Sequence, residues 1–295
     1  MTRHPFFGLG LATFGALILT PDTMFMRWSD MGGFQMLAWR GLTMGGLLLI
    51  LWLGSGAPGR AALTTRTGAA IIGCHMVNAT LFSLGIAVAP VPVVLFAVAV
   101  SPVFAALFAW AIAGETAGRA TWITTAAVLA GIFVAILGRD TGGVGFNLAS
   151  ALGAAAGLGV AASLALTFVI LRKARDIPIL PAIGGGSFLA GMAGLVLAGG
   201  PAAMLEGQVW AIAVTGLVIL PASFLALTFA SRHTSAANVS LLMLLETVLG
   251  PIWVWAFAGE PLTLPMLIGG AIVIGSLAIF LVVTGRGRRP TPRAQ

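Results

Sequence analysis

Ten apolar stretches, each about 17 to 24 residues long, follow one another along the chain and restrict its fold more than any other feature. A helix of about 20 residues crosses the hydrocarbon core of a membrane, so each stretch is long enough for one crossing. Only 8% of the residues are charged, against roughly 25% in soluble domains, which argues against a soluble globule. The sequence therefore predicts an all-α integral membrane protein with ten transmembrane helices, near residues 6–26, 33–53, 67–88, 91–113, 120–137, 148–171, 179–199, 209–230, 236–258 and 263–284.

Basic residues are distributed unevenly between the loops that these helices predict. Twelve fall on one side of the membrane and only two, Arg27 and Arg139, on the other. Because basic loops stay in the cytoplasm, both termini and a short basic C-terminal tail are expected inside, with the protein in the cell's inner membrane. Contact with anionic lipid also accounts for the net charge of +7. No basic domain lies outside the membrane, so no nucleic-acid partner is expected.

The first apolar stretch has no small-residue cleavage site before Pro21. It is therefore expected to remain as a helix of the protein, because removal as a signal peptide requires such a site.

The two halves of the chain resemble each other at an offset of 145 residues. The run PVFAALFAWAIAGE at 102–115 aligns with TVLGPIWVWAFAGE at 247–260, and six of fourteen positions agree, among them a tryptophan and a final Gly-Glu. Each half holds five predicted helices, an odd number, so the second half must cross the membrane in the opposite sense. We expect two inverted five-helix repeats, residues 1–141 and 146–295, an arrangement common in alternating-access transporters.

These repeated runs also carry a family resemblance. The stretch from Pro102 to the Gly-Glu that ends the fourth helix, repeated in the ninth, resembles the EamA-type repeats of the drug/metabolite transporter superfamily. The resemblance implies ten helices in a monomer or weak dimer that moves small metabolites, often outward. Where the family commonly has Glu-Pro in the ninth helix, this chain has Glu246-Thr247, and Pro251 follows four residues later. A helix break expected at that point would therefore be displaced or absent.

Glu246 is the single carboxylate in the interior of the ninth predicted helix, about 15 Å from either end. Facing lipid while ionised would cost about 2.5 kcal/mol or more, so it is expected to face a wet cavity, find a partner or hold a proton. Helical spacing places Asn238 on the same stripe, with Trp253 beside it, so that stripe is predicted to face a cavity. Glu246 then either exchanges a proton or contacts a substrate amine, or it is a protonated carboxyl that ties helices together.

Two further helices carry polar residues at membrane depth. Arg40 lies inside the second helix, and Asp22 is its nearest partner by depth. This pair either fixes the first two helices or leaves Arg40 to attract a substrate carboxylate from outside. His75, Asn78 and Phe82 share one face of the third helix. A histidine there either shuttles protons or is a hydrogen-bonded core residue.

Aromatic and proline residues complete the candidate site. Trp39 and Trp253 lie deeper than the tryptophans near the expected membrane boundaries, so they are predicted to contact the apolar body of a ligand. Four prolines interrupt helix interiors and are candidate gating bends: Pro21, Pro102, Pro221 and Pro251.

Small and boundary residues are expected to have structural roles. Two pairs of glycines at a spacing of four predict close helix packing: Gly41 with Gly45, and Gly153 with Gly157. Glu115 and Glu260 end their helices at the membrane surface, so we interpret them as boundary or capping residues.

Missing motifs narrow the function. The only lysine, Lys173, does not follow a phosphate-binding glycine loop, so transport driven by ATP is excluded, and neither a His-Glu-x-x-His nor a Gly-x-Ser-x-Gly motif occurs. No cofactor, metal or enzymatic activity is predicted. The favoured function is a secondary transporter that exports a small amphipathic metabolite such as an amino acid, driven by the proton gradient or by downhill flux. The alternative is an integral membrane enzyme or lipid-handling protein that uses the same intramembrane polar residues, and the visible repeat favours the transporter.

Overall fold

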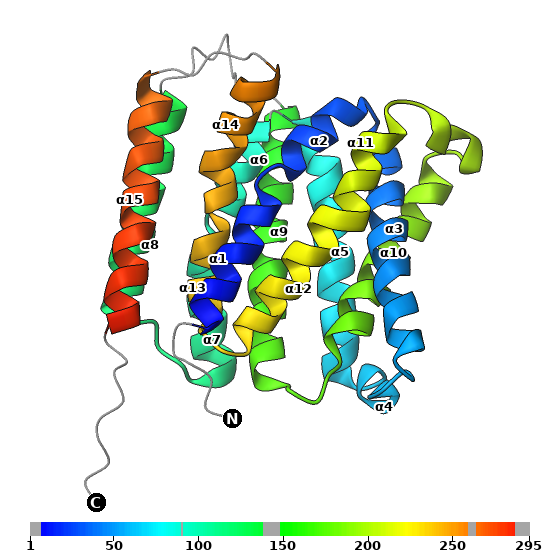
Figure 1. The fold of residues 1–295 in the computed structure, drawn as a ribbon, viewed down its shortest axis with the longest axis horizontal. Coiled ribbons are helices and arrows are strands. Elements are labelled where there is room, and N and C mark those ends of the chain that lie inside the picture. Colours follow the sequence, from blue (N-terminus) through cyan, green and yellow to red (C-terminus); the bar gives the residue numbers. More distant parts are fainter. Residues whose placement is uncertain (1–6, 90, 138–147, 259–263, 287–295) are drawn as a thin grey trace, which may run out of the picture.

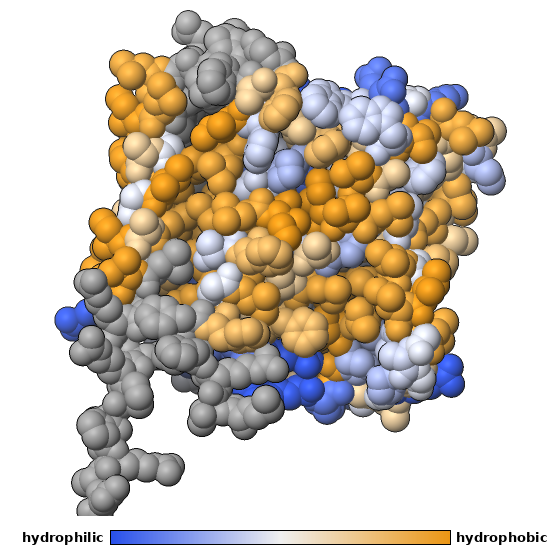
Figure 2. Space-filling view, viewed as in Figure 1, coloured by the Kyte–Doolittle hydropathy of each residue, from blue (hydrophilic) through white to orange (hydrophobic). Residues whose placement is uncertain are grey.

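The computed structural model describes residues 7–89, 91–137, 148–258 and 264–286. These residues form helices joined by short connections, and no strand occurs among them. Most of the helices run side by side between two ends of the molecule, and α1 begins and α15 ends at the same end (Figure 1). The middle of the face in Figure 2 is largely apolar, while hydrophilic residues gather toward the two ends. An apolar belt with polar ends is the surface expected of a membrane protein.

Among the described residues, helices occupy most of each of the ten predicted ranges, with interruptions at residues 20–21, 99–100 and 244. In chain order the elements are α1 (Phe7–Leu19), α2 (Asp22–Ser29), α3 (Gly33–Gly54), α4 (Arg60–Leu63), α5 (Arg66–Val88), α6 (Val91–Val98), α7 (Ser101–Ala113), α8 (Arg119–Leu137), α9 (Leu148–Lys173), α10 (Ile179–Leu197), η1 (Pro201–Leu205), α11 (Val209–Val214), η2 (Thr215–Ile219), α12 (Leu220–Ser231), α13 (Ala236–Met243), α14 (Leu245–Ala258) and α15 (Leu264–Arg286). Six described segments are long and apolar enough to cross a membrane: Phe7–Ser29, Gly33–Gly54, Arg66–Val88, Ala151–Lys173, Ile179–Leu197 and Val209–Ser231. That all ten ranges cross remains a prediction.

Three of the four candidate prolines lie at interruptions between helices. Pro21 separates α1 from α2, and Pro102 lies in the first turn of α7, directly after the break that ends α6. Pro221 lies in the first turn of α12, which continues from the π-helical segment η2. A first turn after a break suits Pro102, because the N–H that proline lacks would have no partner within the helix there.

The break in the ninth range does not lie at Pro251, so that prediction is wrong. Pro251 is inside α14, whereas α13 and α14 are separated at Leu244. Two tight turns mark this break: the Leu244 N–H donates to the Leu241 carbonyl at 3.2 Å, and the Thr247 N–H donates to the Leu244 carbonyl at 3.1 Å. A proline ring clashes with the carbonyl four residues before it, here Thr247, so Pro251 does not explain a break at Leu244. The interruption directly precedes Glu246.

The helix bounds recur along the chain at the same offset of 145 residues as the sequence repeat. The interrupted pair α6 and α7, residues 91–98 and 101–113, recurs as α13 and α14, residues 236–243 and 245–258. The helices α3 and α10 correspond in the same way, as do α8 and α15, and the two members of each pair pack on each other. Figure 1 shows α8 and α15 side by side at one edge of the bundle. The sequence repeat therefore has a counterpart in the secondary structure.

Close helix packing at the predicted glycine pairs is confirmed. A Cβ atom on Gly41 or on Gly45 would lie 2.5 Å from backbone atoms of α10. On α9, a Cβ atom on Gly153 would collide with Ala89, and one on Gly157 would collide with the backbone of α6. Backbones come this close only where side chains are missing, so these glycines set the distance between the helices.

We expect Gly45→Leu to destabilise the protein by about 1 to 3 kcal/mol or more, because overpacking forces the α3 and α10 backbones apart. Gly46→Leu is the matched control, since a Cβ atom at Gly46 meets nothing within 4 Å. Both substitutions bring the same gain in helix propensity, so their difference isolates the packing effect. The apparent melting temperature of the purified protein in detergent measures it, and equal values for the two variants would contradict this explanation.

Glu115 follows the end of α7, as a boundary residue does, and its side chain also joins two helices. The Arg172 Nε, near the end of α9, donates to both Glu115 carboxylate oxygens, at 3.1 and 3.0 Å. The Lys173 Nζ donates to the Ile112 carbonyl at 2.9 Å. These contacts fasten the end of α7 to the end of α9. The equivalent residue of the second half, Glu260, lies outside the described residues.

Candidate functional site

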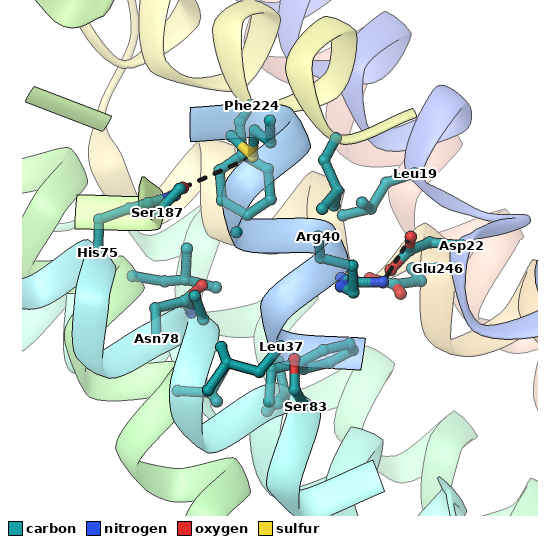
Figure 3. A pocket seen from close by; sticks show the side chains of 18 of the residues that line it. Leu19, Asp22, Leu37, Arg40, His75, Asn78, Ser83, Ser187, Phe224 and Glu246 are labelled. Atoms are coloured by element: carbon teal, nitrogen blue, oxygen red, sulfur yellow. Dashed lines mark hydrogen bonds and ion pairs between the residues drawn. The ribbon is translucent and has the colours of Figure 1, made fainter. Parts of the chain in front are cut away.

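A cavity lies between helices of both halves of the chain (Figure 3). The first half contributes side chains from α1, α2, α3, α5 and α6, and the second half from α9, α10, α12, α13 and α14. Most of the wall is apolar, with Leu37, Met44, Phe82 and Phe224 among the larger side chains. A mainly apolar cavity with a few polar groups is the usual form of a small-molecule site.

Asp22 and Arg40 form a buried ion pair on this cavity. The Arg40 Nη1 donates to both carboxylate oxygens of Asp22, each at 2.8 Å. The Arg40 and Asp22 side chains are 9% and 1% exposed, and the Arg40 guanidinium lies 5.5 Å from the centre of the Phe82 ring. The pairing expected from depth is therefore present, and it joins α2 to α3. Removing one partner of such a pair is costly because the other charge stays buried without compensation.

Glu246 lines the same cavity from the opposite half of the chain. It lies beside Asp22 and Arg40 and is 6% exposed (Figure 3). Within the described part of the chain, its buried Oε1 has no hydrogen-bond partner. The break at Leu244 puts Glu246 in the first turn of α14, where the unpaired N–H groups of a helix favour a negative charge.

His75, Asn78 and Phe82 all line the cavity from one face of α5, as their spacing predicts. His75 is 2% exposed and Asn78 5% exposed. The His75 ring meets the Phe224 ring edge to face, with 5.0 Å between centroids. Neither the His75 Nδ1 nor the Asn78 Nδ2 has a hydrogen-bond partner among the described residues. The α5 face therefore presents two polar atoms whose hydrogen-bonding capacity is unused.

The two tryptophans predicted to contact a ligand are not on the cavity. The Trp39 Nε1 donates to the Met204 carbonyl at 2.8 Å and so fastens α3 to η1. Trp253 is 37% exposed, and its Nε1 donates to the Thr20 hydroxyl at 2.8 Å. Position along a helix gives the depth of a residue but not the direction of its side chain, which explains both errors.

Asn238 also lies away from the cavity. Its Nδ2 donates to the Thr234 hydroxyl at 3.1 Å, and the Thr121 hydroxyl donates to its Oδ1 at 3.4 Å. The prediction counted helical turns from Asn238 to Glu246 as though one helix joined them. The interruption at Leu244 ends that periodicity, so the two residues do not share a stripe.

Several cavity residues were missed or left aside by the sequence prediction. Asp22 was considered only as the partner of Arg40, although a carboxylate in an apolar stretch is itself a signal. Phe224, Ser187 and Met243 also line the cavity. They sit among similar apolar or small residues, so nothing in their spacing distinguishes them.

The cavity wall carries one more acidic than basic side chain, because Asp22 and Glu246 face the single cation Arg40. With all three groups ionised, Asp22, Arg40 and Glu246 together carry one net negative charge. A buried unbalanced charge is costly, so this cluster can accept a proton or the cationic group of a ligand. The described residues contain no group of three or more His, Cys, Asp or Glu side chains that could hold a metal ion.

Residues 151–282 match the family model of the EamA-like transporter family. This part of the chain is an EamA-like transporter domain. EamA-like domains belong to the drug/metabolite transporter superfamily, so the resemblance predicted from the repeated runs is confirmed. The family consists of membrane transporters rather than enzymes. With six segments long enough to cross a membrane and an EamA-like domain, this chain is a multi-pass membrane protein.

A solved structure described only as "Crystal structure of protein" resembles this chain along nearly its whole length. The TM-score is 0.76 at 17% sequence identity, and the similarity covers 96% of this chain and 99% of that one. At this identity the likeness shows a shared fold alone. No curated protein matches the sequence.

Proposed function

We propose that this protein is a secondary transporter that moves a small amphipathic metabolite bearing an amine, such as an amino acid, in exchange for protons. The observation that carries the proposal is the excess of one carboxyl group over the single guanidinium among Asp22, Arg40 and Glu246 on the cavity wall. A proton or a substrate ammonium group would neutralise the cluster, and only one of them is needed at a time. Competition for this charge couples the movement of one to the movement of the other.

Alternating access would come from two inverted repeats, residues 1–141 and 146–295. The recurrence of helix bounds at an offset of 145 residues supports two halves of the same design. Five crossings in each half would orient them oppositely, and both halves contribute side chains to the cavity. Rocking of two such halves around a fixed central site is how repeat transporters expose it to each side in turn.

We propose that the transporter lies in the inner membrane with both termini in the cytoplasm and works as an exporter. The orientation is supported by the excess of arginine and lysine at one set of loops. The outward direction rests on the resemblance to the drug/metabolite transporter superfamily, which implies movement of small metabolites that is often outward. A monomer or weak dimer would suffice, because one chain supplies both sides of the cavity.

Flux into reconstituted vesicles tests this function. A panel of labelled amino acids and amphipathic amines would be added outside vesicles held at about pH 5 inside and about pH 8 outside, conditions in which outward proton flow drives uptake. We expect at least one compound to enter several times faster than it does without the pH difference. Rates equal to those of protein-free vesicles for the whole panel would reject the function. A protein-dependent flux that is the same with and without the pH difference would reject the exchange for protons.

A further inference from the structure

The cavity has a second polar region, at a distance from the charged cluster. Figure 3 shows Arg40, Asp22 and Glu246 gathered on one side, with His75 and Asn78 on the other. Apolar side chains, among them Leu37 and Met44, make up much of the remaining wall. A ligand that contacts both regions must therefore carry two polar groups, while its apolar part meets the apolar wall.

Asn78 is the group in this second region whose chemistry is most restrictive. Its side chain is 5% exposed, and its Nδ2 has no acceptor among the described residues. An amide nitrogen is a donor only, and leaving a buried donor without an acceptor is unfavourable. The nearby His75 Nδ1, on a residue 2% exposed, has no partner in the described chain either. Two such atoms on one face of α5 are placed to bind a ligand.

We propose that Asn78, with His75 beside it, forms a subsite that binds a hydrogen-bond acceptor of the substrate, a carboxylate or carbonyl oxygen. This inference rests on the proposed function, because it assumes that the amine of the same substrate lies at Glu246. Arg40 is the obvious competitor for a carboxylate. Its Nη1 already holds Asp22, however, and Glu246 is adjacent, so a substrate carboxylate there would meet two others. The hydrogen-bond acceptor of the substrate therefore binds at Asn78.

Paired ligands test the subsite without any mutation. Leucine and isoamylamine have the same hydrocarbon body and amine, and only leucine has a carboxylate. We expect the wild-type protein in detergent to bind leucine about tenfold more tightly or better, because isoamylamine leaves the Asn78 donor unpaired. Leucine methyl ester, which keeps a carbonyl acceptor without the negative charge, should also bind more tightly than isoamylamine. The dissociation constant of each ligand is measured by its competition with labelled leucine. For a ligand that does not compete, it is measured by calorimetry.

A substitution of Asn78 tests whether this residue causes the preference for leucine over isoamylamine. Asn78→Leu keeps the approximate size and removes the donor, so the ratio between leucine and isoamylamine should fall to near one. Thr80→Val is the control on the same helix, because the Thr80 hydroxyl bonds the Met76 carbonyl of its own helix at 2.9 Å. This control should keep the wild-type ratio.

The outcomes separate this inference from the function on which it rests. Equal binding of leucine and isoamylamine by the wild-type protein, or an unchanged ratio in Asn78→Leu, would overturn the subsite and leave transport standing. Should neither compound nor the ester bind, the subsite would be rejected together with any amine site at Glu246 for compounds of this size. Because the comparison of ligands needs only the wild-type protein, poor folding of the variant would not leave the subsite untested.

Discussion

Replacing Arg40 by methionine should destabilise the protein by about 3 to 5 kcal/mol, the largest effect expected of any single substitution in the cavity. The substitution leaves Asp22, 1% exposed, without its cation and next to Glu246. Two neighbouring carboxylates would then share a buried space, and both desolvation and repulsion oppose this arrangement. The apparent melting temperature in detergent and the yield of folded protein measure the loss.

Two controls show whether the loss comes from the unpaired charge. The double variant Asp22→Asn with Arg40→Met removes both charges and should recover more than half of the lost stability, because a buried pair contributes little compared with an uncharged replacement. Arg27→Met changes an exposed arginine of the neighbouring α2 and should alter stability by less than about 0.5 kcal/mol. A melting temperature of Arg40→Met equal to that of Arg27→Met would contradict the structural role given to the pair.

Substituting Glu246 by glutamine should reduce proton-driven transport by about tenfold or more while the protein still folds. Glutamine has nearly the same shape but neither releases a proton nor neutralises an ammonium group, so the cavity loses its unbalanced charge. The Glu246 Oε1 has no hydrogen-bond partner among the described residues, so little structural stabilisation is lost with it. Uptake into vesicles with an imposed pH difference measures the effect, and the residual flux should no longer respond to pH.

The control for this substitution is a carboxylate outside the cavity. Glu206 is exposed and lies just after η1, where the Gln35 Nε2 donates to its Oε2 at 3.4 Å. Glu206→Gln removes the same charge from the chain and should transport like the wild-type protein. If Glu246→Gln also transported normally, the role of the Glu246 carboxyl in the wild-type protein would be only to tie helices together.

Much of the fold was predictable because hydrophobic length is a strong signal in membrane proteins. Each predicted range holds helix where it is described, and Pro21, Pro102 and Pro221 lie at interruptions. The position of the break at Leu244 was not predictable, because Leu244 lies between Met243 and Leu245, in an apolar run with no helix-breaking residue. That single interruption also explains why Asn238 and Glu246 point to different surroundings.

The site was predictable where charge or spacing within one uninterrupted helix carried the information. Arg40 and Glu246 were found because a charge inside a membrane needs a partner or a cavity, and His75 with Asn78 because α5 is continuous. Trp39 and Trp253 were misplaced because an aromatic ring at this depth can pack against protein, ligand or lipid. Only the packing of neighbouring helices decides among these surroundings, and sequence does not give that packing.

Counterflow in reconstituted vesicles tests the central claim, that one cavity between the two halves opens to each side of the membrane in turn. Vesicles are loaded with an excess of an unlabelled substrate and placed in a dilute solution of the same compound carrying a label, with no gradient of protons. A cavity that alternates between sides carries unlabelled substrate outward and returns with labelled substrate. The label inside the vesicles should therefore rise above its equilibrium level and then decline. Label that only equilibrates, with no such overshoot, would show an open pore or a leak and would contradict the account.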